Sequence, residues 1–253
     1  MDLIGGHEGI GTVVAIAANT PSNKLIKVGS RVGLKFLATA CFNCDLCLKG
    51  FEGHCSKFES HGNSLDGTFC EYAVGYVDAV TPIPDEISDA EAAAIMCAGV
   101  TVYSALAQSG LHIGEWVVIP GAGGGLGHLA LQYALAMGLR VVAIDTGASK
   151  RDLCLSLGAS TFLDFQTSSN LVQDVQSITK GGAQAVLVAA GGSLNIKGIF
   201  LGNRKHAIEA VQIAATGKVK VTHTIRGLSE LNEVYDEMSK GQIVGRVVLD
   251  ISK

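Results

Sequence analysis

The sequence predicts an α/β protein in which a mostly β first part precedes a doubly wound, parallel-sheet domain. Two observations lead to this class. From about residue 116 onward, short apolar runs alternate with helical patterns, which is typical of a parallel sheet with helices on both faces. The first hundred residues instead contain short strand-like runs separated by loops rich in glycine, asparagine and cysteine.

A capping box marks the change between the two parts. Ser88 and Glu91 are spaced so that the hydroxyl and the carboxylate can each satisfy an amide at the start of an alanine-rich helix. The strands expected beyond it are 116–119, 141–144, 161–165, 185–189, a strand near Val219, and 244–250. The expected helices are 126–137, 150–157, 171–179, 206–216 and 231–238, the first two ended by Gly138 and Gly158.

One joint in this alternation is too short. The strand 185–189 and the next extended run, 194–199, are separated by little more than Gly191 and Gly192. Neighbouring parallel strands need a crossover of about a dozen residues. A glycine hairpin would make the pair antiparallel, which is foreign to a doubly wound sheet, so we expect that a strand-helix unit has been lost here.

Composition and charge restrict the partners. The 253 residues carry a net charge of −4 with lysines and arginines scattered along the chain, so neither nucleic acid nor an anionic membrane is indicated. Apolar stretches are interrupted before they reach spanning length. An odd number of cysteines, seven, with no export signal fits a reducing cytoplasm.

Four cysteines form the most specific motif. Cys41, Cys44, Cys47 and Cys55 follow the spacing C-x2-C-x2-C-x7-C within a loop-like segment. Four thiolates at short loop distances complete the tetrahedral shell of Zn²⁺ and leave no position for substrate, so such a zinc is structural. Two alternatives stay open: an iron–sulfur cluster, which favours a tighter fourth spacing and a following proline, and disulfides, which require an oxidising compartment.

A glycine-rich loop follows the strand 116–119 and precedes a helix. The glycines of the loop 121–127 let backbone amides approach a pyrophosphate at the positive end of the helix. Asp145 ends the next strand about 20 residues later, where a carboxylate accepts ribose hydroxyls and repels a 2′-phosphate. The pattern favours a dinucleotide site that prefers NAD over NADP, against the alternative of a simple glycine turn.

His7 and Glu8 form a second candidate site with Cys97. A neutral imidazole is a good zinc ligand, and the adjacent carboxylate can orient it or enter the coordination shell. Taken singly, His7 would be an ordinary structural histidine and Cys97 an ordinary buried thiol.

The order of these motifs resembles the zinc-dependent medium-chain alcohol dehydrogenases, especially the fungal tetrameric type. The resemblance runs nearly from end to end. It rests on Gly6-His7-Glu8, the four cysteines, Asp66-Gly67-Thr68-Phe69, Cys97-Ala98-Gly99-Val100-Thr101, the loop 121–127, Gly202-Asn203-Arg204 and Gly241-Gln242-Ile243-Val244-Gly245-Arg246. The family implies a GroES-like catalytic domain over 1–98, a Rossmann domain over 99–215 and a return to the catalytic domain over 216–253.

The resemblance also implies residue roles. His7 and Cys97 would be catalytic zinc ligands, with Glu8 beside them or as an alternative ligand. The pyrophosphate would be faced by Gly124, Gly125, Leu126 and Gly127. Asp145 and Lys150 would face the adenosine ribose, Thr101 the nicotinamide side, and Arg246 a cofactor phosphate. In that family zinc acts as a Lewis acid on the alcohol while NAD accepts the hydride.

Two functions follow as expectations. The first is an NAD-dependent oxidoreductase acting on a primary or secondary alcohol or the matching aldehyde, as a homo-oligomer. Both domains are expected to be shorter than in the family. No residue here matches the cysteine that precedes Gly6-His7-Glu8, and a strand-helix unit is expected to be missing from the second domain. We therefore expect a lower activity. The alternative is a catalytically silent protein that binds zinc or nucleotide or serves in assembly. A zinc-free quinone reductase is disfavoured by His7 and the four cysteines.

Overall fold

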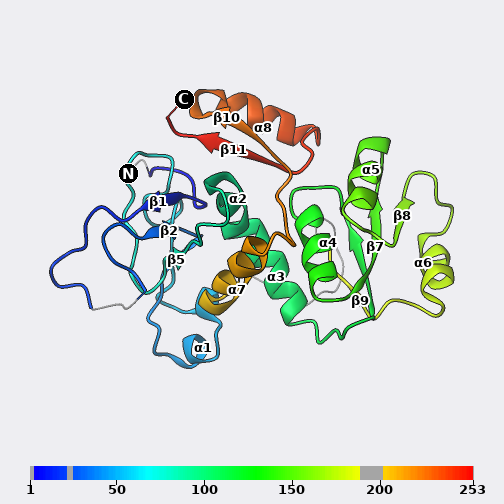
Figure 1. Cartoon of the computed structure of the whole chain (residues 1–253), viewed down its shortest axis with the longest axis horizontal. Coiled ribbons are helices and arrows are strands. Elements are labelled where there is room, and N and C mark those ends of the chain that lie inside the picture. The colour runs from blue at the N-terminus through cyan, green and yellow to red at the C-terminus, as the bar shows by residue number, and fades with distance from the viewer. Residues whose placement is uncertain (1–2, 22–24, 189–201, 253) are drawn as a thin grey trace.

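The computed structural model describes residues 3–21, 25–188 and 202–252 (Figure 1). The first part is built on strands of only two or three residues that are joined by long loops. Two antiparallel sheets, β1-β2-β5 and β3-β4, hold this part together. The strands are β1 (Ile10–Thr12), β2 (Arg31–Gly33), β3 (Leu37–Thr39), β4 (Glu59–Ser60) and β5 (Thr81–Pro82), and the helices are α1 (Asp45–Leu48) and the 3₁₀ turn η1 (Glu52–His54).

A continuous helical run leads from the first part into the second. It consists of α2 (Asp89–Ala94), a π-helical segment η2 (Ile95–Gly99) and α3 (Val100–Ala107). The Ser88 hydroxyl caps it as expected, accepting from the Glu91 amide at 3.3 Å, but the Glu91 carboxylate accepts from that hydroxyl rather than from an amide. The run is long and apolar enough to cross a membrane by length and composition alone, yet 56% of its most apolar window is buried, as in a core helix.

The second part contains the predicted parallel sheet, in the order β8-β7-β6-β9. Alternate residues of β6 and β7 face opposite sides: Val117 and Val141 pack in the core formed with α3, α4 and α7, whereas Val118 and Val142 pack against α6. This confirms the doubly wound class. The elements are β6 (Trp116–Pro120), α4 (Gly127–Ala136), β7 (Arg140–Asp145), α5 (Ala148–Ser156), β8 (Thr161–Asp164), α6 (Leu171–Thr179) and β9 (Ala185–Val186).

The short joint at Gly191 and Gly192, with the run 194–199, lies outside the described residues. Beyond it come α7 (Arg204–Ala215), β10 (His223–Gly227), the 3₁₀ turn η3 (Leu228–Glu230), α8 (Leu231–Ser239) and β11 (Arg246–Asp250). β10 and β11 pair in parallel as a separate sheet. In Figure 1 this sheet and α8 lie at the top of the view.

The prediction of a strand near Val219 is wrong. Val219 is buried, but no strand forms there, and β10 begins only at His223. The backbone of the preceding segment is bonded by side chains instead: the Gln132 amide accepts from the Lys220 N–H at 2.8 Å and donates to the Lys220 carbonyl at 2.9 Å. A side chain of α4 therefore satisfies groups that a neighbouring strand would otherwise satisfy.

Candidate functional site

His7 lies in an extended loop that is held by the segment 66–69. The amides of residues 67–69 donate to the carbonyls of residues 4–6 at 2.7 to 3.1 Å. Two glycines permit this approach, because a Cβ at Gly67 would lie 2.1 Å from the Gly6 carbonyl oxygen and Gly6 has φ of +90°. The loop is thereby fixed in the conformation that presents His7 and the residue after it.

Cys97 is presented by the π-helical turn η2. Ile95, Met96 and Ala98 are buried in the core, whereas Cys97 remains partly exposed. A π turn is wider than an α turn and is frequently found at functional sites. Here it places one thiol at the edge of the core without breaking the long helix.

His7, Glu8 and Cys97 converge. Their donor atoms all lie within 4.8 Å of one another. Zinc binds nitrogen, sulfur and carboxylate oxygen at about 2.0–2.3 Å, which places tetrahedral ligands at most about 3.8 Å apart, so a small contraction suffices and the donor set fits Zn²⁺. Burial, with the charge of Glu8 as a further cause, raises the pKa of the Cys97 thiol to about 12. A cation between these groups would favour the thiolate.

Arg246 links this cluster to the glycine loop. Its guanidinium donates to both oxygens of Glu8, at 2.8 and 2.7 Å. Its side chain also lies against Gly125, where a Cβ would be 3.1 Å from the arginine Cδ. The residue predicted to face a cofactor phosphate therefore stands between the loop and the cluster.

The glycine loop has the close packing that a dinucleotide fingerprint requires. A Cβ at Gly127 would lie 2.0 Å from the Gly121 carbonyl oxygen, so the first turn of α4 can approach the end of β6 only with glycine there. Gly123 donates its amide to the Asp145 carboxylate at 2.9 Å, and Lys150 pairs with the other oxygen at 3.2 Å. Gly124 and Leu126 complete the turn into the helix.

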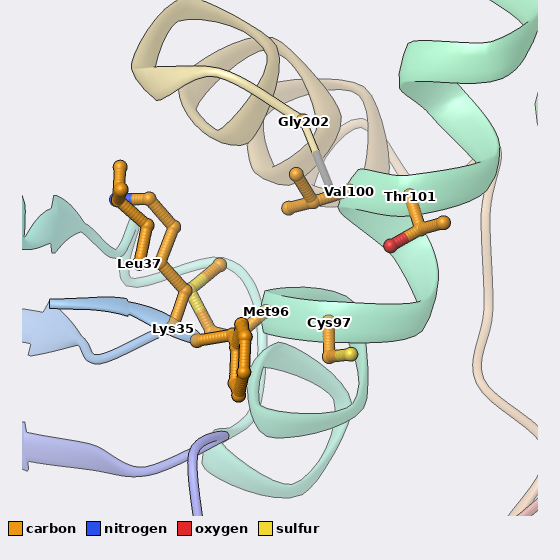
Figure 2. A pocket seen from close by; sticks show the side chains of 8 residues that line it. Lys35, Leu37, Met96, Cys97, Val100, Thr101 and Gly202 are labelled. Atoms are coloured by element: carbon orange, nitrogen blue, oxygen red, sulfur yellow. The ribbon is translucent and has the colours of Figure 1, made fainter. Parts of the chain in front are cut away.

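Cys97 is one of the residues that line a small pocket (Figure 2). Cys97 and Thr101 come from adjoining turns of the η2–α3 run, with Gly202 beside Val100, and residues 35–37 form the facing wall. The structure thus brings the predicted ligand Cys97 and the predicted nicotinamide-side residue Thr101 to one pocket. Asp145 and Lys150 lie at the end of β7 and on α5 and do not line it.

The four cysteines converge as a single cluster. Sulfur separations are 3.9 Å for Cys41–Cys47, 3.9 Å for Cys44–Cys55 and 3.5 Å for Cys41–Cys55. A tetrahedron with metal–sulfur bonds of about 2.3 Å has edges of about 3.8 Å, so the cluster fits one zinc ion. All four are free thiols in the structure, which disfavours disulfides. The Asn43 amide is the main cause that lowers the pKa of Cys41 to about 6, which prepares a thiolate.

A set of buried charged residues that the sequence did not reveal lies next to both the four-cysteine cluster and the Cys97 pocket. Lys35 and Glu52 are 3% and 4% exposed. Lys35 donates to the Ala79 carbonyl, and burial lowers its pKa to about 8. Glu52 pairs through Oε1 with Arg204 at 3.2 Å, and the guanidinium lies over the Phe42 ring at 4.3 Å. The sequence feature that could have indicated this buried set is the charged Lys35 within the otherwise apolar run 32–38.

Comparison with known proteins identifies relatives of the whole chain. Residues 1–85 match the family model of the alcohol dehydrogenase GroES-like domain, and residues 125–199 match that of zinc-binding dehydrogenases. An alcohol dehydrogenase of Schizosaccharomyces pombe is 41% identical over 291 residues, covering 100% of this chain and 82% of the relative.

Solved structures show the same fold. The alcohol dehydrogenase of the archaeon Aeropyrum pernix superimposes with a TM-score of 0.84 at 29% identity, covering 98% of this chain and 82% of that one. The acetophenone reductase of Geotrichum candidum, solved in complex with NAD, gives a TM-score of 0.78 at 23% identity, covering 100% and 82%. The second likeness is one of fold alone.

Proposed function

The chain belongs to the zinc-dependent medium-chain alcohol dehydrogenases, and we propose that it transfers hydride between a primary or secondary alcohol and NAD at the site formed by His7, Glu8 and Cys97. The observation that carries this proposal is the convergence of these three side chains beside a pocket that also contains Thr101. Oxidation releases the aldehyde or ketone, with the hydride passed to NAD and the proton to solvent.

The protein groups would divide the work between metal, cofactor and substrate. His7 and Cys97 would hold the catalytic zinc, and Glu8 is the third donor in reach. Zinc, when bound, supplies Lewis acidity that lowers the pKa of an alcohol. Thr101, which lines the pocket beside Cys97, would face the nicotinamide side.

The strand order reverses between β6 and β9, which opens a crevice at the carboxyl ends of the strands. The cofactor would lie in this crevice and extend along the carboxyl ends of β6 and β7. The loop from Gly124 to Gly127, at the start of α4, would bind its pyrophosphate, with Arg246 as the neighbouring cation. Asp145 and Lys150 would bind the adenosine ribose.

The NAD preference rests on the Asp145 carboxylate. We expect NADPH to bind at least about tenfold more weakly than NADH, because a 2′-phosphate meets like charge there. The variant Asp145→Asn should reduce the difference in affinity between NADH and NADPH. Asp164→Asn, one strand away, should leave that difference unchanged. Tighter binding of NADPH by the wild type in a fluorescence titration would contradict the assignment.

The decisive experiment combines metal content with turnover. We expect about one zinc per chain to survive extensive dialysis, held by the four cysteines, and a second to bind on addition of zinc. Alcohol-dependent NADH formation should depend on the second equivalent, disappear in Cys97→Ala, and run below the rate of a full-length relative. No NADH formation at saturating zinc would contradict the proposed activity.

That contrary result would favour the second candidate, a catalytically silent zinc-binding and nucleotide-binding protein. One observation supports this candidate: both Glu8 oxygens already accept from Arg246, so a zinc ion would compete with the guanidinium for this carboxylate, and His7 and Cys97 are the two donors outside that ion pair. Two ligands bind zinc less tightly than three. NADH binding without turnover would identify this case.

The domain division and setting are also part of the proposal. Residues 1–98 would form the catalytic domain, 99–215 the Rossmann domain, and 216–253 the return to the first domain. The contacts of β10 and β11 with α2, and the Arg246–Glu8 pair, support the return. We propose a cytoplasmic homo-oligomer whose partner is a small alcohol or aldehyde, not nucleic acid or a membrane; sedimentation equilibrium would test the oligomer.

A further inference from the structure

His128 is a fully buried histidine on the first turn of α4, directly below the glycine loop. Its Nδ1 lies 2.9 Å from the Gly124 carbonyl oxygen, which also accepts the His128 backbone amide at 3.0 Å. Both lone pairs of that carbonyl are therefore used by one residue. The conformation of the loop at Gly124 is fixed from beneath.

The other ring nitrogen faces the C-terminal segment. The Thr222 amide donates to Nε2 at 3.2 Å, so Nε2 is an acceptor and the ring proton must be on Nδ1. Burial is the main cause that lowers the pKa of His128, and the charge of Arg246 acts in the same direction, although the carbonyls of Gly124 and Gly125 oppose it. The ring is neutral at neutral pH, as this pair of hydrogen bonds requires.

Thr222 carries the connection on to Arg246. Its carbonyl accepts the Arg246 amide at 2.9 Å, and that guanidinium binds Glu8. Gly245, with φ of +73°, permits the approach, since a Cβ there would lie 2.2 Å from the Thr222 oxygen. One unbroken series of hydrogen bonds thus runs from the dinucleotide loop to the His7–Glu8–Cys97 cluster.

We infer that His128 is a positioning residue, which ties the pyrophosphate-binding loop to the segment that aims Arg246 at both the cofactor and Glu8. The inference rests on the proposed function, because it assigns His128 a role in cofactor binding. His128 touches neither substrate nor metal ligands, and it acts through Gly124 and Thr222.

The test measures nucleotide binding rather than turnover. His128→Leu removes both side-chain bonds, His128→Asn keeps an amide at the place of Nδ1, and His128→Gln keeps an acceptor at the place of Nε2. ADP-ribose, which contains the pyrophosphate, and adenosine, which lacks it, compete with NADH fluorescence. Gln132→Met is the matched control, because Gln132 is also buried on α4 and bonds the His128 carbonyl and the Lys220 backbone, but neither the His128 ring nor the loop.

We expect His128→Leu to weaken ADP-ribose binding about tenfold and adenosine binding by less than about twofold. The two lost hydrogen bonds hold the loop that would bind the phosphates, and adenosine has no phosphate. Asn and Gln should each weaken ADP-ribose binding as well, since each keeps only one end of the bridge. Gln132→Met should lower the melting temperature without changing the ratio of the two affinities.

Several results would overturn the inference. Equal weakening of both ligands by His128→Leu would show a general structural loss, and wild-type ADP-ribose binding in His128→Asn would show that the link to Thr222 is not needed. Wild-type protein that binds neither ligand would defeat the proposed function, and this inference with it. Independently of any ligand, the ¹⁵N shifts of His128 should report the Nδ1–H tautomer, and an Nε2–H tautomer would contradict the bridge.

Discussion

Arg246 and Glu8 form a two-oxygen ion pair between residues 238 positions apart in the sequence. Both side chains are largely shielded, at 23% and 26% exposure. The pair joins the last strand of the chain to the loop that carries His7. It places one cation between the His7–Glu8–Cys97 cluster and the glycine loop.

The variant Arg246→Lys should weaken NADH binding about tenfold and lower the free energy of unfolding by about 1 kcal/mol, because the one nitrogen of an ammonium cannot serve both Glu8, which Nη2 binds, and the glycine loop, where Nη1 lies near Gly125. Fluorescence titration and urea unfolding measure the two effects. Arg226→Lys, which alters ion pairs with Glu230 and Glu237, serves as the control. Unchanged NADH affinity in Arg246→Lys would contradict a cofactor role.

Replacement of one cysteine of the cluster should remove one zinc per chain. Cys55→Ser leaves three thiolates, and the loops 41–55 then lose the metal that crosslinks them, so the melting temperature should fall strongly. Cys154→Ala is the control, because Cys154 is buried in α5 and lies in no cluster of metal-binding side chains among the described residues. Equal zinc contents in Cys55→Ser and wild type would contradict the assignment.

The Arg204–Glu52 pair should stabilise the junction between the cysteine cluster and α7. Arg204→Met leaves the buried Glu52 carboxylate without its ion partner and should cost about 1–2 kcal/mol, a value reduced because Arg204 is 41% exposed. The double variant Arg204→Met/Glu52→Gln should recover part of this loss in a double-mutant cycle. Additive effects of the two changes would show that the pair contributes nothing.

Lys35 predicts an alkaline pH dependence of stability. Burial lowers its pKa from 10.5 to about 8 in the folded state, so the unfolded chain binds more protons between these values and stability rises with pH there. The cost, about 3 kcal/mol, is complete below pH 8 and absent above pH 10.5.

Lys35→Met should therefore be most stable relative to wild type near pH 7, and its advantage should shrink by pH 10. Urea unfolding at both pH values measures the difference, with the exposed Lys27 replaced by methionine as the control. A difference that stays constant with pH would contradict a buried, charged lysine.

Local patterns predicted the second half of the fold well. β6, β7 and α6 were recognisable because apolar runs of strand length and helical periodicity reflect burial directly, and Gly138 and Gly158 follow the helices they end. The strand near Val219 failed because burial alone does not distinguish a strand from a segment whose backbone is bonded by side chains of another element.

The sequence by itself determined which residues are candidates for the chemistry: the cysteine spacing, the glycine loop with Asp145, and Gly6-His7-Glu8 are local arrangements of the right donor types. Only the tertiary structure decided how they meet. The π turn at Cys97, the buried Lys35 and Glu52, the Arg246–Glu8 pair and the His128 bridge all depend on contacts between distant segments. No local spacing encodes such contacts, because they arise when the packing of the core brings separate elements together.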